Sequence, residues 1–255
     1  MSATPTPAAM TLARIAMAAG AVVMRHYDAG CDAREKSDAS PVTDADQEAE
    51  TLILAELARE FPGVPVVAEE EAAAGRIAMV GARFFLVDPL DGTKEFLSRN
   101  GEFTVNIAEI ENGVPVRGVV LAPAKNRLFV GDETGAYEVS PDLTQVRPIA
   151  VRDPAADGIV AVGSRSHSDA QTMEYLKGFT VKSFVGAGSS LKFCLVAAGE
   201  ADLYPRHGRT MEWDTAAGHA VLRAAGGTVT GWDGGPFLYG KPGFDNPPFV
   251  ARGKV

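Results

Sequence analysis

Two aspartates stand close together in the stretch FFLVDPLDGTKEF, residues 84–96, directly after an apolar run. Asp88 precedes a proline, and such a residue is held extended, so we expect its carboxylate at the mouth of a strand. Asp91 can approach the same side, while Gly92 and Thr93 open a short helical segment whose free backbone N–H groups would bind an anion. Carboxylates for a cation thus lie beside amides for a phosphate. The alternative is a tight turn between two strands, which Pro-x-Asp-Gly also favours.

Other carboxylates are available to the same cation. Glu69, Glu70 and Glu71 follow a predicted strand in VPVVAEEEAAAG, and Asp214 stands at the start of a predicted helix in MEWDTAAG. Two carboxylates about 4 Å apart repel by roughly 4 kcal/mol at an effective dielectric of about 20, so such a cluster needs a cation. Magnesium, a hard cation bound by oxygen ligands and often bridged by phosphate, suits the set. A solvated acidic loop and electrostatic capping of the helix by Asp214 are the alternatives.

The first half of the chain must position most of these acids. Apolar residues at helical spacing predict helices over residues 8–27 and 44–60, with Thr43 or Asp44 as the N-cap of the second. From residue 64 the pattern is that of strands, in VPVVA, RFFLVD, FTVNIAEI, VRGVVLA and RLFVGD, with ENGVP as a hairpin turn. This half is predicted as helices packed on an antiparallel sheet.

Near residue 150 the pattern changes to alternating strands and helices. Strands are predicted in GIVAVGS, FTVKSFVG and ADLYPR, separated by a helix near residues 168–176 and another at SSLKFCLVAAG. The last helix, MEWDTAAGHAVLRAAGG, runs into a Gly-Gly stop and a final strand TVTGW. We therefore predict two lobes, an N-terminal α+β lobe over residues 1–150 with most metal ligands and a C-terminal α/β lobe over 151–255 with Asp214 and the residues for substrate specificity.

The composition argues against several classes of function. Hydrophobic residues make up 46% and charged residues 22% of the chain, and no apolar run reaches the roughly 18 residues of a membrane span, so we expect a soluble protein. The formal charge of −9 argues against a nucleic acid polymer or anionic lipid as partner. Cys31 and Cys194 lack metal-binding spacing, and Cys194 is expected as a buried small hydrophobe.

The N-terminal segment does not have the pattern of a secretion signal, because Arg14 falls inside its apolar stretch. We therefore expect a cytoplasmic location, with peripheral attachment at the inner face of the cell membrane as a variant of it.

Three motifs follow one another along the chain: AEEE at residues 68–71, DPLDGT at 88–93 and WDTAAG at 213–218. With them the chain resembles the inositol monophosphatase superfamily of magnesium-dependent, lithium-sensitive phosphatases over nearly its whole length. The resemblance implies an α+β / α/β fold, a layered αβαβα sandwich with two lobes. Within the superfamily, DPLDGTKEFLSRNGEFTVNIA, GSRSH and GSSLKFCLVAAGEADLYPR look most like the bacterial 3'(2'),5'-bisphosphate nucleotidases.

The resemblance also implies roles for the residues that match the family motifs. Two or three Mg²⁺ ions per site would be held by carboxylates and one backbone carbonyl, those of Glu69, Asp88, Leu90, Asp91 and Asp214. Catalysis would use Glu69 and Thr93 to orient the attacking water, with Asp46 supporting Thr93. Glu70 and Glu71 leave the choice within the acidic loop open, and Asp44 is the alternative to Asp46. Lys36 resembles a basic residue that faces the metal and phosphate.

Substrate binding is implied for residues of both lobes: Glu69, Leu90, Asp91, Gly92, Thr93, Ser164, His167, Lys192, Arg206 and Asp214. A second phosphate needs a basic partner, which Arg165 or Arg206 could supply as a forked pair of hydrogen bonds and Lys192 as a point charge. An exposed cation is an equal alternative for Lys192 and the favoured one for Arg209. Trp213 is expected to pack at the start of the last helix, with stacking on adenine as the alternative.

The activity implied by the resemblance is removal of the 3'-phosphate from adenosine 3',5'-bisphosphate (PAP), a reaction of sulfur metabolism that gives AMP. Some members also accept the sulfated nucleotide PAPS. Water would attack phosphorus in line, without a covalent protein intermediate. The alternatives are an inositol or other sugar phosphatase with the same metal ligands, and a catalytically idle relative that binds metal or phosphate. The expected partner is a small phosphorylated nucleotide, and a homodimer is left open.

Overall fold

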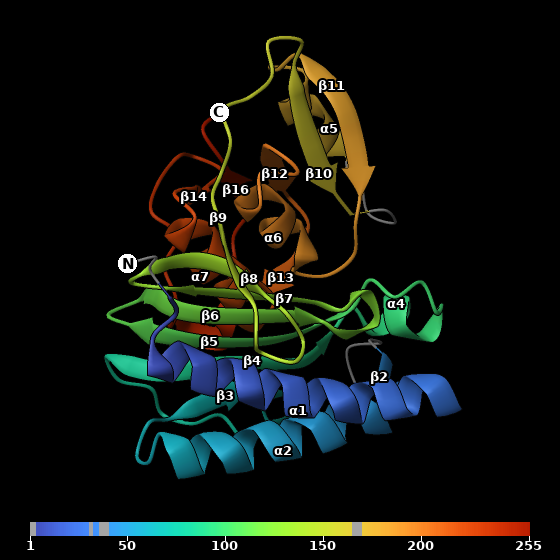
Figure 1. Ribbon diagram of the computed structural model, residues 1–255, viewed down its shortest axis with the longest axis vertical. Helices are drawn as coiled ribbons and strands as arrows, with labels where there is room; N and C mark the ends of the chain where they lie inside the picture. The colour runs from blue at the N-terminus through green and yellow to red at the C-terminus, as the bar shows by residue number, and fades with distance from the viewer. Residues whose placement is uncertain (1–3, 31–32, 36–40, 165–169) are drawn as a thin grey trace.

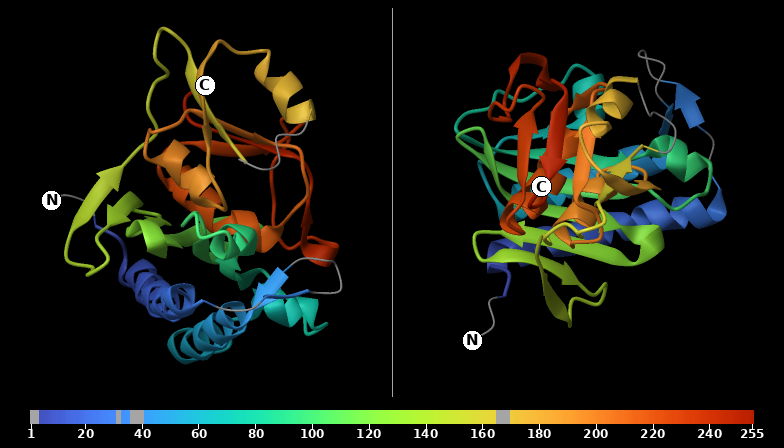
Figure 2. Two further views of the ribbon diagram at one scale, coloured as in Figure 1. Left: turned by 90° about the vertical axis from the view of Figure 1, so that its right-hand side faces the viewer. Right: turned by 90° about the horizontal axis from the view of Figure 1, so that it is seen from above.

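Helices and sheets alternate in layers in the computed structural model, which describes residues 4–30, 33–35, 41–164 and 170–255. Two N-terminal helices cover one face of a seven-stranded sheet, and two later helices lie between this sheet and a five-stranded one (Figure 1). A short helix packs on the far face of the second sheet. Figure 2 shows the same stack from two further sides. The predicted sandwich is thus confirmed.

The seven strands of the first sheet follow the order of the sequence from edge to edge: β3 (Val66–Ala68), β4 (Arg83–Asp91), β5 (Thr104–Glu111), β6 (Val114–Ala122), β7 (Arg127–Asp132), β8 (Gly135–Val139) and β9 (Val146–Ile149). The predicted hairpin between β5 and β6 is present, since Asn112 and Gly113 both have positive φ, as its turn requires. The prediction of a wholly antiparallel sheet is wrong at one pair, because β3 runs parallel to β4.

The N-terminal helices form as the apolar spacing predicts, α1 over Pro7–Ala29 and α2 over Asp44–Glu60. Thr43 is the N-cap of α2, and Asp46 accepts from the Thr43 backbone N–H, which completes a capping box. α1 is long and apolar enough to cross a membrane by length and composition, contrary to the prediction, but half of its apolar window is buried in the fold. Its buried face packs against α2 and the sheet, as in a core helix.

The second sheet has the order β11 (Val181–Gly186), β10 (Ile159–Gly163), β12 (Leu203–Arg206), β16 (Phe249–Arg252) and β14 (Thr228–Gly231). The prediction of TVTGW as the final strand is wrong, because β16 follows it in sequence and inserts antiparallel between β12 and β14. The helices of this half are α5 (Ala170–Leu176), α6 (Leu191–Ala197) and α7 (Glu212–Ala224).

Short elements complete the chain between these layers. They are the helices α3 (Glu69–Ala73) and α4 (Thr93–Leu97), the 3₁₀ turns η1 (Pro123–Lys125) and η2 (Pro242–Phe244), and the two-stranded pairs β1 (Ala33–Glu35) with β2 (Pro41–Thr43) and β13 (Thr210–Met211) with β15 (Asp245–Asn246). α3 and α4 begin with the predicted site residues Glu69 and Thr93, and β13 leads into α7, which carries Asp214.

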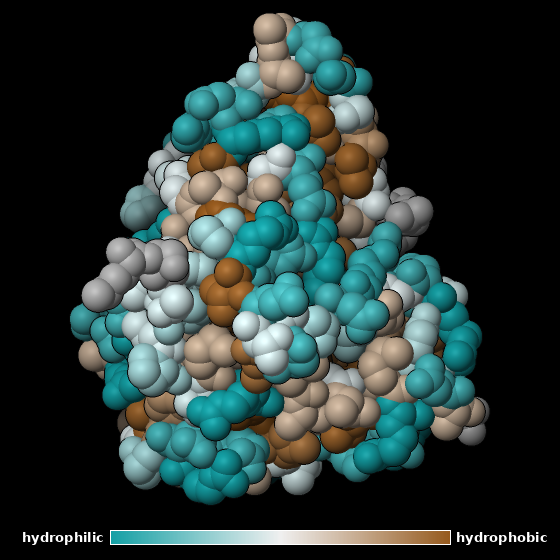
Figure 3. All heavy atoms as spheres, viewed as in Figure 1, coloured by the Kyte–Doolittle hydropathy of each residue, from teal (hydrophilic) through white to brown (hydrophobic). Residues whose placement is uncertain are grey.

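The edge strand β11 is the most exposed strand of the second sheet. Residues 182–185 are all exposed, so both faces of this strand meet solvent. In Figure 3 apolar surface gathers over β10 and β11 in the upper part of the view. The exposed apolar side chains of β11 include Phe184 and Val185. Elsewhere on this face the apolar surface is interrupted by polar residues.

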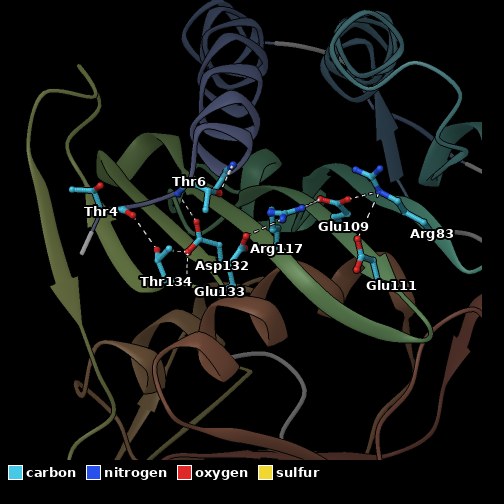
Figure 4. A network of polar contacts seen from close by, with 10 residues as sticks. Thr4, Thr6, Arg83, Glu109, Glu111, Arg117, Asp132, Glu133 and Thr134 are labelled. Atoms are coloured by element: carbon cyan, nitrogen blue, oxygen red, sulfur yellow. Dashed lines mark hydrogen bonds and ion pairs between the residues drawn. The ribbon is translucent and has the colours of Figure 1, made fainter. Parts of the chain in front are cut away.

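A buried ion-pair network joins the strands of the first sheet on the side covered by α1 and α2 (Figure 4). The Glu109 side chain is fully buried, and its two oxygens lie 2.6 Å from Arg83 Nε and 2.6 Å from Arg117 Nη1. Nearby, the Thr6 backbone N–H donates to Asp132 Oδ2 at 2.7 Å. The start of α1 is thereby attached to the sheet.

The helix α7 lies between the two sheets and contacts strands of both. It approaches the first sheet closely over Gly118 and Gly131, where an added Cβ would lie 2.5 Å from the Ala217 carbonyl oxygen and 2.6 Å from the Val221 Cα. The first sheet ends at Ile149 and the second begins at Ile159. The lobe boundary near residue 150 stays a prediction, because a helix of the second half completes the core of the first.

Gly131→Ala should therefore force α7 away from the sheet and lower the free energy of unfolding by about 1–3 kcal/mol. Gly81→Ala is the matched control, because no atom lies within 4 Å of its added Cβ, and a change within about 0.5 kcal/mol is expected there. Urea unfolding followed by circular dichroism measures both. Equal stability of the two variants would contradict the close packing of α7.

Candidate active site

The parallel pairing of β3 with β4 brings two acids together. Ala68 pairs with Val87, so the next residues, Glu69 and Asp88, leave neighbouring strands at the same edge of the sheet. Glu69 begins the short helix α3, whose second and third backbone N–H groups donate to the two oxygens of one buried acid of α2. This acid is Glu50, at 2.8 Å from each nitrogen. It holds the start of α3, and with it Glu69, in place.

Within the acidic loop the structure separates the three glutamates. Glu69 lines a cavity with Asp88, Asp91 and the other predicted ligands. Glu71 instead forms a two-bond ion pair with Arg76, 2.7 Å for each bond, and neither it nor Glu70 lines the cavity. The geometry therefore favours Glu69 for the role that the sequence left open.

The DPLDGT segment turns sharply at the end of β4. Asp88 Oδ1 accepts the Leu90 backbone N–H at 3.0 Å. Gly92 then adopts φ of 91°, a left-handed conformation that glycine permits, and α4 begins at Thr93. The Thr93 hydroxyl lies 3.4 Å from Asp46 Oδ1 and 3.4 Å from the Leu90 carbonyl oxygen. Asp46, buried in its capping box, thus stands behind Thr93 as the resemblance implies, while Asp44 is exposed and pairs with Arg34.

Asp214 arrives from the other half of the chain, as the third residue of α7. Its Oδ2 accepts the Met211 backbone N–H at 2.8 Å. Asp91 Oδ2 likewise accepts the Ser190 backbone N–H at 2.6 Å. In Asp88, Asp91 and Asp214 alike, one oxygen is bound by a backbone N–H, which orients the carboxylate at the cavity wall.

These side chains meet around a cavity of about 330 Å³. It is lined by Pro41, Glu69, Asp88, Leu90, Asp91, Gly92, Thr93, Lys94, Glu95, Arg209 and Asp214. Every residue predicted to bind metal is in this set. The structure therefore brings together acids that are separated by up to 145 positions in the sequence, from 69 to 214.

The electrostatics of the cavity fit a divalent cation. Burial, and then the neighbouring charges of Glu69, Asp91 and Asp214, raise the pKa of Asp88 well above its usual value. Burial and the charges of Asp91 and Glu69 do the same to the pKa of Asp214. Burial raises the pKa of Asp91 to about 6, against the opposing influence of Lys192. Hard oxygen donors that repel one another in this way are suited to Mg²⁺.

Within the described part of the chain, no three His, Cys, Asp or Glu side chains lie close enough together to form a metal-ligand cluster as they stand. The donor set fits magnesium by its chemistry, and the ligand roles of individual residues stay a proposal.

A second hollow of about 150 Å³ adjoins the first, and the two share Asp91, Gly92, Glu95, Arg209 and Asp214 in their walls. Ser164, Lys192 and Arg206 line it, together with Glu95, Gly188, Ser189, Phe193, Tyr204, Arg209, Thr210 and Thr215. The predicted substrate residues that the structure describes are thus also brought to one place, next to the acidic cavity.

The sequence left open whether Lys192 is an exposed cation, and the structure shows that it is not. It is buried, and its Nζ donates to the carbonyl oxygens of Ser189 at 2.5 Å and Ala187 at 3.3 Å. Burial lowers its pKa to about 8. Arg206 Nε donates to the Gly208 carbonyl oxygen at 3.2 Å. Both cations therefore contact the protein backbone on one side and the second hollow on the other.

The remaining candidates divide into packing residues and residues outside the described part. Trp213 is buried against Phe244 and lines neither hollow, in agreement with a packing role. Cys194 is fully buried, and burial raises the pKa of its thiol. Arg209 is exposed and pairs with Asp245 at 2.7 Å, although it also lines both hollows. The sequence candidates Cys31, Lys36, Arg165 and His167 lie outside the described residues.

Sequence reasoning missed two buried glutamates that hold the site. Glu50 gives no local sign of its role, because the amides that it binds lie 20 and 21 positions away. Glu212, fully buried next to Asp214, accepts the backbone N–H groups of Gly240 and Lys241 at 2.7 and 2.9 Å and so attaches the start of α7 to a distant loop. An acid just before WDTAAG is the only signal that the sequence offers.

The fold and site define a class of protein. The model of the inositol monophosphatase family matches residues 5–250, and the chain belongs to this family. It is 47% identical to the 3'(2'),5'-bisphosphate nucleotidase CysQ of Escherichia coli strain K12, across 92% of this chain and 96% of that protein, and 46% identical to CysQ of Salmonella typhimurium.

Solved structures of this family have the same fold as this chain. The crystal structure of CysQ from Bacteroides thetaiotaomicron is 39% identical, with a TM-score of 0.80 over 97% of both chains. That of the extragenic suppressor protein suhB from Bartonella henselae is 27% identical, with a TM-score of 0.78 over 98% of this chain and 95% of that one. The family predicted from three sequence motifs is confirmed, and the relatives cover nearly the whole chain.

Asp88→Asn should stabilise the metal-free protein, because it removes one of several buried carboxylates that repel each other. In EDTA at pH 8 we expect the free energy of unfolding to rise by roughly 1–2 kcal/mol. Asp202→Asn is the contrasting control, since Asp202 is equally buried but forms a fork of 2.8 and 2.9 Å with Arg152. That variant should lose stability. A loss in Asp88→Asn as large as in Asp202→Asn would contradict this account.

Glu50 should make the metal-free protein less stable as the pH rises. Burial raises its pKa to about 7 from a usual 4.5, so between these values the unfolded chain releases the proton first. Stability from this group is then fully present below about pH 4.5 and falls by up to about 1.4 kcal/mol per pH unit until about pH 7.

Urea unfolding in EDTA across this pH range tests the dependence. Glu50→Gln should make this fall shallower but not abolish it, because the raised pKa values of the cavity aspartates also lower stability as the pH rises. Glu48→Gln, on the exposed side of the same helix, should leave the fall unchanged. An unchanged slope in Glu50→Gln would show that Glu50 does not titrate in this range.

Proposed function

We propose that this chain is a magnesium-dependent 3'(2'),5'-bisphosphate nucleotidase that hydrolyses adenosine 3',5'-bisphosphate to AMP and phosphate, with PAPS as a further substrate. One observation carries the proposal: an acidic cavity adjoins a hollow lined by three cations, Lys192, Arg206 and Arg209, and the two share Asp91 in their walls. A substrate with two phosphates needs such a pair of sites. The 46–47% identity to proteins named as nucleotidases of this kind supports the same substrate.

Two or three magnesium ions would be held by the carboxylates of Glu69, Asp88, Asp91 and Asp214 and by the Leu90 carbonyl oxygen. Bound magnesium would supply Lewis-acid polarisation of the phosphate and a lowered pKa for water. The aspartates are prepared for this role, because a backbone N–H binds one oxygen of each. A preorganised carboxylate loses little freedom when it becomes a ligand.

Glu69 and Thr93 would orient the attacking water. The Thr93 hydroxyl lies within reach of Asp46 Oδ1, and donation to this buried carboxylate leaves the lone pairs of its oxygen free to accept a hydrogen from water. The water oxygen would form a bond to phosphorus, the bond from phosphorus to the ribose 3'-oxygen would break, and a proton from water would end on that oxygen. Backbone N–H groups of Gly92 and Thr93 would bind phosphate oxygens.

The second phosphate and the nucleoside would occupy the hollow lined by Ser164, Lys192 and Arg206. Arg206 can present a fork to a phosphate, and Lys192 a buried positive charge. His167 completes the predicted set from outside the described residues. The cytoplasmic location, the attachment to the inner membrane face and a homodimer stay predictions from the sequence.

Phosphate release from PAP, PAPS, inositol 1-phosphate and fructose 1,6-bisphosphate by the purified protein tests this function. We expect magnesium-dependent release from PAP at least about tenfold faster than from either sugar phosphate, and none in EDTA. A preference for inositol 1-phosphate would instead assign the chain to the sugar phosphatases and remove the argument from the second hollow.

Asp91→Asn should lower turnover of PAP by at least about 100-fold, because a proposed ligand loses its charge. Glu71→Gln is the matched control, since this acid belongs to the same site region but lies outside the cavity and pairs with Arg76. Its turnover should stay within about twofold of the unmodified protein. Magnesium-dependent turnover retained in folded Asp91→Asn would count against the proposed metal site.

A further inference from the structure

The loop over residues 186–190 crosses from the second sheet to the wall between the two hollows. It joins β11 to α6, and Gly188 and Ser189 line the second hollow. At its end, Ser190 turns away from the hollow and is almost fully buried against β5. The backbone N–H of Ser190 donates to Asp91 Oδ2 at 2.6 Å. The loop thus contacts a proposed metal ligand directly.

Two buried polar residues of β5 extend this contact. The strand register places Asn106 opposite Asp88 and Thr104 opposite Asp91, and both side chains are fully buried. The Ser190 hydroxyl donates to Asn106 Oδ1 at 2.6 Å, and Thr104 Oγ1 lies 3.0 Å from the same hydroxyl. Asn106 Nδ2 in turn lies 3.4 Å from Asp91 Oδ2.

The chemistry of these groups gives the chain of hydrogen bonds one direction. The Ser190 hydroxyl has one hydrogen, which goes to Asn106, so Thr104 must be the donor to Ser190. Asn106 then has its amide nitrogen, and not its oxygen, toward the carboxylate. Each group therefore donates toward Asp91, and such a chain is strengthened by the negative charge at its end. Asp91 Oδ2 receives both donors, and Oδ1 is the oxygen left for a ligand in the cavity.

The loop is held in this position from its other side. The Gly188 backbone N–H donates to Glu102 Oε2 at 3.0 Å, and an added Cβ at Gly188 would lie 2.4 Å from the Glu102 carbonyl oxygen. Lys192 Nζ binds the Ser189 and Ala187 carbonyl oxygens. Ser189 itself has φ of 49°, an unfavourable conformation for a residue other than glycine. These contacts hold a strained loop against Asp91.

We propose that Asn106 and Ser190 are positioning residues for Asp91, and that through them the loop 186–190 of the substrate hollow orients a metal ligand of the neighbouring cavity. The proposal rests on the proposed function for the identity of the metal and the substrate. Its consequence is that the loop which meets the nucleotide also sets the geometry of the metal site. Neither residue touches the reacting atoms, so their effect must pass through Asp91.

Titration calorimetry of the metal-free protein with Mg²⁺ alone tests the positioning role without turnover. Asn106→Leu keeps the approximate volume of the side chain and removes both polar atoms, and we expect about 10- to 100-fold weaker Mg²⁺ binding. Ser190→Ala keeps the backbone N–H bond and removes the hydroxyl, so a smaller loss is expected. Because Ser190 acts through Asn106, the double variant should bind Mg²⁺ no more weakly than Asn106→Leu.

Steady-state kinetics with PAP provide the second measurement. A positioning defect should lower kcat in Asn106→Leu by about tenfold or more, in parallel with the loss of Mg²⁺ affinity, while KM for PAP at saturating Mg²⁺ stays within about twofold. Tyr137→Phe is the control, because it removes another buried hydroxyl, on β8, outside this network. It should change the melting temperature but neither the Mg²⁺ affinity nor kcat.

The outcomes separate this proposal from the proposed function. Unchanged Mg²⁺ affinity and kcat in folded Asn106→Leu would overturn the positioning role even if PAP is hydrolysed rapidly. If Asn106→Leu does not fold, unchanged Mg²⁺ affinity and kcat in Ser190→Ala would overturn it instead. Weaker Mg²⁺ binding in the variants of a protein that does not hydrolyse PAP would support positioning and contradict the nucleotidase function. A protein that binds no Mg²⁺ would overturn both.

Discussion

The burial of several carboxylates around one cavity is the constraint on which the rest of the site depends. Burial and mutual repulsion raise the pKa values of Asp88 and Asp214, and isolated carboxylates in such a place would be strongly unfavourable. The chain limits the cost by giving each aspartate a backbone N–H donor from a turn or a helix start. These donors are the backbone N–H groups of Leu90, Ser190 and Met211. The backbone in three segments that are distant in sequence must therefore adopt a conformation that points an N–H group at a buried carboxylate.

The layered fold supplies the means to assemble these turns. The parallel pair β3–β4 places Glu69 beside Asp88, and α7, between the sheets, brings Asp214 to the same edge. The buried acids Glu50 and Glu212 then hold the starts of α3 and α7 through backbone amides. These two positioning groups lie behind the ligands, on the helices α2 and α7, which are held rigid by the packing of the layers.

Much of the fold could be predicted because its signals are local. Apolar spacing predicted α1, α2 and most strands, and the DPLDGT and WDTAAG motifs identified acids that the structure brings together. Partners distant in sequence could not be predicted, since a hydrogen bond between Glu50 and α3 or between Asn106 and Ser190 leaves no periodicity in either segment. The strand β16 was missed for the same reason. Nothing in its own four residues indicates that it pairs with β12 on one side and β14 on the other. The burial of Lys192 could not be predicted either. Its Nζ donates to backbone carbonyl oxygens whose positions depend on the path of the loop before α6.

The position of α7 between two sheets has a consequence for how the chain can be divided. The helix buries residues on both sides, and one continuous core includes Phe84 and Phe129 of the first sheet with Tyr204 and Phe249 of the second. A cut in the connection between Ile149 and Ile159 would leave one fragment with an uncovered sheet face and the other with an unsupported helix. Neither piece could bury its apolar surface alone, yet the two are complementary, so the protein is a candidate for reconstitution from fragments in which catalysis reports directly on reassembly.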